Sequence, residues 1–230
     1  MLATGFAPLQ AVAGTFSVVP VRIYMTPRDR AVAITIVNEG DTEVALQADI
    51  NTWRQKPDGT DEQVPTEDLV LSPPILKLPP RGRQVVRLAR ITAPDLSQQL
   101  TYRLIVREVP EAVAPKDQVI QIPIALALSM PVFITPPAAK SNVACQPARS
   151  PDGKFQVTCA NTGTAYAQVR EVQVRQGANL LGRMEGGVYI LPGARKGIAV
   201  PMDKPAPAGP TQLNVTFDDG KSQVFEASLP

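Results

Sequence analysis

Histidine is absent from the 230-residue sequence, and this absence bears first on catalysis and metal binding. Histidine is the commonest general base, the usual activator of a Ser or Cys nucleophile and the most frequent metal ligand. Nucleophile-elbow, zinc-protease and glycine-rich phosphate-loop motifs are also missing. The acidic groups at residues 58–62 and 218–220 lack the ligand spacing of calcium loops and are interpreted as turns. We expect no catalytic residues, no metal, no cofactor and no small-molecule substrate.

Strong charge and long apolar stretches are scarce as well. The net charge is +2, and basic and acidic residues alternate along most of the chain instead of forming a basic block. Nucleic acid is therefore not expected as a partner. Beyond the N-terminal segment no stretch reaches 18 uninterrupted apolar residues, so the mature protein is expected to be soluble.

The sequence has only two cysteines, Cys145 and Cys159, which lie seven residues on either side of Asp152 in the turn signal SPDG. This symmetry predicts that they face each other across a β-hairpin, where Cα atoms are close enough for a disulfide. Such a bond would close a loop of about 15 residues, stabilise the fold by roughly 3 kcal/mol and persist only in an oxidising compartment. The alternative is a pair of free buried thiols in a cytosolic protein.

The N-terminal segment, residues 1–13, is mostly small and apolar and ends in Ala11, Val12 and Ala13. An A-x-A pattern of this kind precedes many signal-peptide cleavage sites. A basic region at the start is missing. We interpret the segment as the remnant of a truncated leader, the alternative being an apolar N-terminal extension.

Short β-rich runs recur about every 10 to 15 residues, and helical periodicity is almost absent. Most of the 24 prolines fall between these runs, where they mark turns and strand edges. The pattern predicts an all-β chain of two immunoglobulin-like β-sandwich domains, residues 14–135 and 138–230, divided at Pro136 and Pro137. Trp53 is interpreted as a core aromatic residue. The predicted strands are residues 16–24, 31–38, 44–53, 84–89, 101–109, 119–134, 155–160, 167–175, 196–200, 212–217 and 222–227.

The longest apolar run, residues 119–134, carries a large apolar side chain at every even position from Ile120 to Ile134. In a β-strand these side chains would line one face over about 50 Å, which exceeds the span of one small sandwich. Part of the row is therefore expected to project beyond the core or along an exposed edge. Pro123 and Pro131 cannot donate ladder hydrogen bonds, so the strand is expected at a sheet edge. The alternative is a long, bent core strand that changes sheets.

Three stretches of the first half resemble the PapD-like periplasmic pilus chaperones. YRLIVREVP at residues 102–110 resembles the sixth strand of that family, and residues 121–136 resemble its long seventh strand. The proline-marked stretch at residues 72–80, followed by QVVRL, resembles its turn into a strand. The resemblance covers the first domain and implies a boomerang of two immunoglobulin-like domains. It also implies a periplasmic chaperone of fimbrium biogenesis whose partners are pilus subunits and an outer-membrane usher.

Donor-strand complementation, as the resemblance implies it, would insert the seventh strand into a subunit groove, a form of strand addition. By alignment the inserted side chains would be Ile122, Ile124, Leu126 and Leu128. The family also anchors the terminal carboxylate of the subunit with two basic residues in the interdomain cleft.

This anchor is where the sequence departs from the family pattern. Arg22 aligns with the first-strand Arg, whereas Pro131 replaces the seventh-strand Lys. Arg103 is the first candidate substitute because a charged group within an apolar strand needs an anion, and Arg87 is the second. The alternative for Arg103 is a solvent-facing side chain.

An internal salt bridge of the family also looks broken. Gln99 and Thr135 occupy two aligned charged positions, and Asp219 remains. Together these departures suggest a branch serving archaic pili. The rival function is an immunoglobulin-like adhesin or structural surface module, which would explain the sandwiches without explaining the long apolar row.

Overall fold

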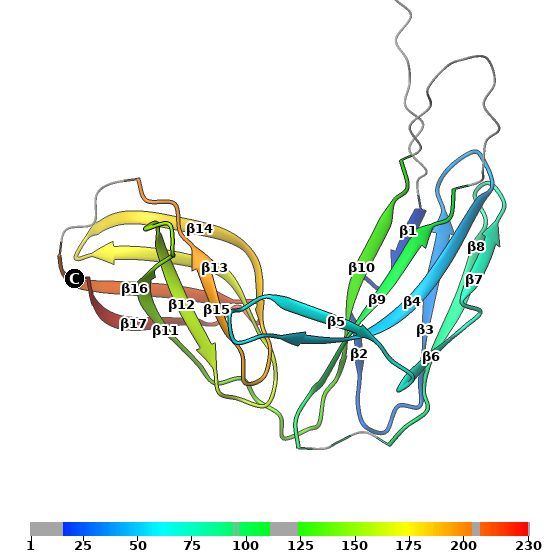
Figure 1. Cartoon of the computed structure of the whole chain (residues 1–230), viewed down its shortest axis with the longest axis horizontal. Coiled ribbons are helices and arrows are strands. Elements are labelled where there is room, and N and C mark those ends of the chain that lie inside the picture. Colours follow the sequence, from blue (N-terminus) through cyan, green and yellow to red (C-terminus); the bar gives the residue numbers. More distant parts are fainter. Residues whose placement is uncertain (1–15, 94, 96, 111–123, 204–207, 230) are drawn as a thin grey trace, which may run out of the picture.

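The computed structural model describes residues 16–93, 95, 97–110, 124–203 and 208–229. This described part of the chain consists of β-strands, turns and connections and contains no helix. The strands form two lobes that meet at an angle, as in a boomerang (Figure 1). The prediction of an all-β, immunoglobulin-like chain is confirmed.

The first lobe is a sandwich of two sheets. One sheet has the order β1-β3-β8-β6, and the other has the order β2-β10-β9-β4-β5, with β7 also paired to β4. The strands are β1 (Phe16–Val19), β2 (Ile23–Met25), β3 (Ala31–Asn38), β4 (Val44–Gln55), β5 (Asp61–Pro65), β6 (Leu69–Ser72), β7 (Ile75–Leu78), β8 (Arg83–Arg90), β9 (Leu100–Glu108) and β10 (Ala127–Ile134).

The second lobe is also a two-sheet sandwich. Its sheets have the orders β11-β12-β15 and β14-β13-β16-β17. The strands are β11 (Val143–Arg149), β12 (Phe155–Asn161), β13 (Ala167–Gln176), β14 (Asn179–Ile190), β15 (Arg195–Ala199), β16 (Gly209–Phe217) and β17 (Ser222–Leu229).

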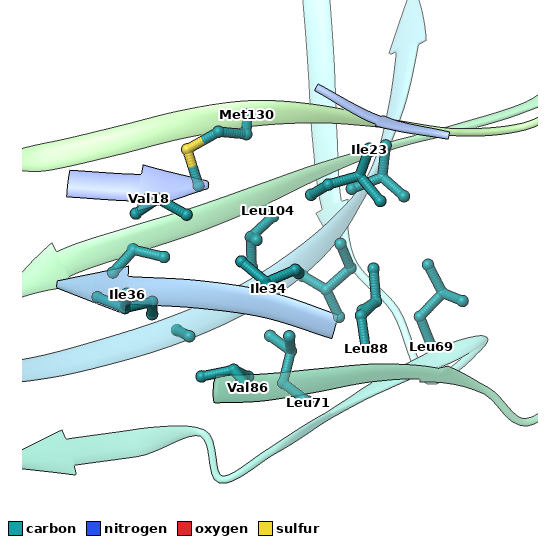
Figure 2. Close-up of a cluster of buried hydrophobic side chains, with 14 of the residues drawn as sticks. Val18, Ile23, Ile34, Ile36, Leu69, Leu71, Val86, Leu88, Leu104 and Met130 are labelled. Atoms are coloured by element: carbon teal, nitrogen blue, oxygen red, sulfur yellow. The ribbon is translucent and has the colours of Figure 1, made fainter. Parts of the chain in front are cut away.

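The core of the first lobe is formed by inward-facing side chains of both sheets. Figure 2 shows residues such as Ile34, Leu88 and Leu104 pointing into the space between the sheets. Alternate residues of β3, β8 and β9 are buried, because successive side chains of a strand point to opposite faces. The alternating apolar residues in the sequence of these strands are thus the residues that form the core.

The predicted strand over residues 16–24 is wrong in one respect, because it is two strands in different sheets. β1 pairs with β3 up to Val19, and β2 starts again at Ile23 beside β10. Pro20 separates them and has no backbone N–H with which to continue the ladder. This change of sheet places Arg22 at the crossing point between the two sheets of the first lobe.

The predicted disulfide between Cys145 and Cys159 is confirmed. The two residues are directly paired on β11 and β12, with their Cα atoms 4.0 Å apart and their sulfurs bonded. Gly153 in the hairpin turn has φ 79°, a conformation that glycine adopts without strain. Both cysteines are buried in the core of the second lobe.

Candidate functional site

The apolar row of residues 119–134 becomes progressively exposed toward its N-terminal end. Val132 is 0% exposed and belongs to the core of the first lobe, and Leu128 is partly buried against the same core. Leu126 is 36% exposed and Ile124 is 73% exposed. Ile122 and the earlier part of the row lie outside the described residues. The row therefore extends beyond the core, as its length predicted, but the strand begins only at Ala127, so the predicted strand 119–134 is wrong over residues 124–126.

Within the described residues, the edge of β10 opposite β9 is free from Ala127 to Pro131. Its antiparallel pairing with β9 runs from Ala127 to Ile134, whereas the parallel strand β2 covers only Val132 to Ile134 on the other side. No other strand of the described chain pairs with β10. The expected edge position is thus found from Ala127 to Pro131, and the three-residue strand β2 covers the last three residues of β10.

The backbone groups at this edge can be assigned from two hydrogen bonds. The N–H of Glu108 on β9 donates to the carbonyl oxygen of Leu126 at 2.9 Å, and the N–H of Thr135 donates to Met25 of β2 at 2.8 Å. Even-numbered residues of this strand thus direct their backbone groups to β9, and odd-numbered residues direct theirs to the opposite side. The N–H and C=O groups of Ala127 and Ser129 consequently point to the free edge.

An aromatic cluster lies where the two lobes meet. The ring of Phe133, at the end of β10, stacks on Tyr166 with centroids 4.1 Å apart and on Tyr24 at 5.7 Å. Trp53 from β4 meets the ring of Tyr189 from β14 edge-on at 5.2 Å. Trp53 is buried, but it packs into the core of the second lobe and not into that of the first. These rings hold the lobes together.

Hydrogen bonds also join the lobes at this junction. The side chain of Gln55, at the end of β4, donates to the carbonyl of Tyr189 at 2.9 Å and accepts from the N–H of Leu191 at 3.0 Å. Gln99 donates to the hydroxyl of Thr135 at 2.7 Å and accepts from the N–H of Tyr166 at 2.8 Å. Gln99 and Thr135, at the family's charged positions, are therefore linked by a neutral hydrogen bond.

Arg22 and Arg103, two of the three predicted anchor residues, meet at the aromatic cluster. The guanidinium carbon of Arg103 lies 3.7 Å from the centre of the Trp53 ring and 5.7 Å from that of Tyr189. Arg22 approaches the same Tyr189 ring, also at 5.7 Å. Such stacking stabilises both the cation and its orientation.

In the sheet, Arg103 lies opposite the position where the family has its seventh-strand Lys. It is paired directly with Pro131, the residue that replaces the family's seventh-strand Lys. Burial lowers the pKa of Arg103, and its buried Nε has no hydrogen-bond partner among the described residues. The side chain is thus a partly buried cation with unused donor capacity.

Arg22 has partners from the second lobe. Its Nη1 contacts Asp218 Oδ2 at 3.2 Å, and its Nη2 donates to Gln168 Oε1 at 2.7 Å. The Tyr166 hydroxyl donates to the same Asp218 oxygen at 3.1 Å and lies 2.9 Å from the Tyr24 hydroxyl. Burial, followed by the contact with Tyr24, raises the pKa of Tyr166.

A cavity of about 680 Å³ lies beside Tyr24, Tyr166 and Asp218 and is lined by residues of both lobes.

Arg87 lies elsewhere in the first lobe. It is exposed on β8, in the other sheet of the sandwich, where it pairs with Ala33 and Ser72. Asp219, the third position of the family's salt bridge, contacts Lys221 at 2.8 Å. The structure thus brings Arg22 and Arg103 to one site and does not bring Arg87 there.

The comparisons with known proteins agree on the fold and the family. Residues 15–140, more than half of the chain, match the family model described as pili and flagellar-assembly chaperone, PapD N-terminal domain. No curated protein sequence matches the chain. Among the described residues no helix is long and apolar enough to cross a membrane.

Several solved structures resemble this chain at low sequence identity. The CsuC–CsuE chaperone–tip subunit complex of archaic Csu pili from Acinetobacter baumannii matches with TM-score 0.70 and 18% identity, covering 93% of this chain and 98% of the other. Escherichia coli DraB matches with TM-score 0.60 and 18% identity, covering 96% and 99%. The SafB–SafA chaperone–pilin complex of Salmonella enterica matches with TM-score 0.62 and 14% identity, covering 96% and 99%.

Proposed function

Because the chain belongs to the family of pili and flagellar-assembly chaperones with a PapD N-terminal domain, we propose that it assists pilus subunits by donating the free edge of β10. Assistance to pilus-subunit assembly is the function of the family, whose members are not enzymes. A free-standing adhesin or structural module is not favoured. We further propose that the protein acts in the periplasm, where its disulfide would persist, and delivers subunits to an outer-membrane usher.

The observation that carries this proposal is an exposed apolar segment directly before β10, combined with free backbone groups at the start of β10. Added strands gain affinity from main-chain hydrogen bonds and specificity from alternate side chains. Ala127 and Ser129 offer the backbone groups, and Ile124 and Leu126 offer the exposed side chains. Leu128 is already partly buried in the chaperone core, so it contributes less. Ile122 remains a proposed donor residue outside the described part.

The exposed side chains set a scale for the affinity. Burying the parts of Ile124 and Leu126 that are still exposed, 73% and 36% respectively, would contribute roughly 2 to 3 kcal/mol before the ordering costs of association. Main-chain hydrogen bonds and a carboxylate anchor would add to this. We propose Arg22 and Arg103 as that anchor, because they lie at one site and Arg103 has unused donor capacity.

Co-expression tests the function directly. The protein, exported to the periplasm with subunits encoded by neighbouring genes, is expected to co-purify with one of them as a one-to-one complex. Light scattering after size-exclusion chromatography gives the stoichiometry. If these subunits accumulate in folded form without the protein, and the protein is always recovered alone, the chaperone function is refuted in favour of a structural module.

A further inference from the structure

One of the two proposed anchor arginines already forms an ion pair with a carboxylate of the same chain. Arg22 precedes β2 in the first lobe, whereas Asp218 follows β16 in the second lobe, and their side chains form an ion pair at 3.2 Å. The side chains are 29% and 18% exposed, respectively, so solvent reaches both of them. A carboxylate from outside would meet a guanidinium that already has an anionic partner.

Arg103 differs from Arg22 in this respect. Its guanidinium stacks on Trp53, its Nε has no partner, and no ion pair with an acidic side chain is found for it in the described chain. Both arginines approach the ring of Tyr189, but of the two only Arg22 forms an ion pair with an acidic side chain of the described chain, whereas Asp61 acts on Arg103 as a more distant charge. Before a ligand binds, Arg22 is therefore ion-paired, whereas Arg103 has a hydrogen-bond donor with no partner among the described residues.

We propose that Asp218 is an internal competitor, which holds Arg22 until the carboxylate of a bound subunit displaces it. This inference rests on the proposed function. It adds that the competition between Asp218 and the subunit carboxylate lowers the affinity of the site for the subunit. Subunit binding then exchanges one ion pair for another across the junction of the lobes.

The geometry of the ion pair explains why displacement is feasible. Asp218 contacts Arg22 through Oδ2 alone, and that oxygen also accepts a hydrogen bond from the Tyr166 hydroxyl. An incoming carboxylate that also replaces the neutral Gln168 Oε1 at Nη2 can form two parallel hydrogen bonds with the guanidinium, which is a stronger arrangement. Two carboxylates at one guanidinium also repel each other. Binding of the incoming carboxylate therefore weakens the contact between Asp218 and Arg22. After displacement Asp218 retains the hydrogen bond from Tyr166.

Asp218 and Asp219 provide a matched pair of variants. Asp218→Asn removes the competing charge while keeping the side-chain shape. Asp219→Asn removes the same charge one residue away, where the partner is Lys221 instead of Arg22. The probe is an N-acetylated alanine tripeptide with a free C-terminal carboxylate, and its C-terminal amide is the control ligand. Subunit capture is measured separately, so a failure of the chaperone function is distinguishable from a failure of this inference.

Asp218→Asn is expected to lower the Kd for the tripeptide acid about two- to five-fold, the range for a partly exposed ion pair. Asp219→Asn should leave the Kd unchanged, and the amide should bind to neither variant. In the unmodified protein, NMR should show the Arg22 Nε–H signal and the Asp218 carboxyl carbon signal shifting together during the titration. The inference is overturned if both variants have the same effect, if Asp218→Asn does not tighten binding, if the Asp218 signal does not move, or if the acid does not bind.

Discussion

Ile124→Asp is expected to abolish the recovery of a chaperone–subunit complex while leaving the free chaperone folded. Ile124 is 73% exposed, so a carboxylate there remains solvated in the free protein. In a subunit groove the same carboxylate would lose its water without gaining a partner, at a cost of several kcal/mol. The melting temperature of the free variant should stay within about 2 °C of the original, as for other surface substitutions.

Val132→Asp, at an even position of the same apolar row but inside β10, is the matched control. Val132 is 0% exposed in the core of the first lobe, so its replacement buries an unpaired charge. This variant should unfold or fail to accumulate even without a subunit. Should Ile124→Asp show the same collapse, Ile124 belongs to the core of the chaperone and is not a donor residue. Normal complex recovery with Ile124→Asp would equally contradict the assignment.

Loss of either proposed anchor arginine is expected to reduce subunit binding strongly. A hydrogen bond to a charged group is worth about 1.5 to 3 kcal/mol, so Arg22→Ala or Arg103→Ala should raise the Kd roughly ten- to hundred-fold. Subunit pull-down followed by titration measures the loss. Circular dichroism and thermal melting show whether the free variants remain folded.

Arg103 needs a second variant because its side chain also packs on Trp53. Arg103→Met keeps an apolar stem against the ring and removes the charge, so it separates lost packing from lost recognition. Arg87→Ala is the control for loss of one positive charge from the first lobe, because Arg87 is exposed on the other sheet. Equal losses for Arg87→Ala and Arg103→Ala would place the anchor outside the aromatic cluster.

Local patterns in the sequence were sufficient to predict the disulfide and the projecting row. Cys145 and Cys159 are symmetric about a turn, and hairpin pairing follows from that symmetry alone. The row was predictable because its length exceeds what one sandwich can bury. Short or interrupted strands were harder to identify. The glycines at positions 182, 186 and 187 lie within β14 and break the apolar alternation of its sequence. β7 lies within the proline-rich stretch 72–80, which was interpreted as a turn.

Contacts across the junction could not be predicted from local patterns. The ion pair between Arg22 and Asp218 joins residues 196 positions apart, and its formation depends on how the lobes pack. Trp53 is buried in a first-lobe strand, as an isolated aromatic residue suggests, but its packing partners are in the second lobe. The alignment of Pro131 with the missing Lys identified the gap in the anchor, and the pairing of Pro131 with Arg103 required the register of the sheet.

Amide hydrogen exchange along β10 is the most direct test of strand donation. The N–H groups of Ala127 and Ser129 point to the free edge, whereas those of Leu128 and Met130 are directed to β9. In the free chaperone the first pair should exchange rapidly and the second slowly. In the purified subunit complex Ala127 and Ser129 should become protected, with little change at Leu128 and Met130. Rapid exchange at Ala127 and Ser129 in an intact complex would contradict the proposal that β10 pairs with the subunit.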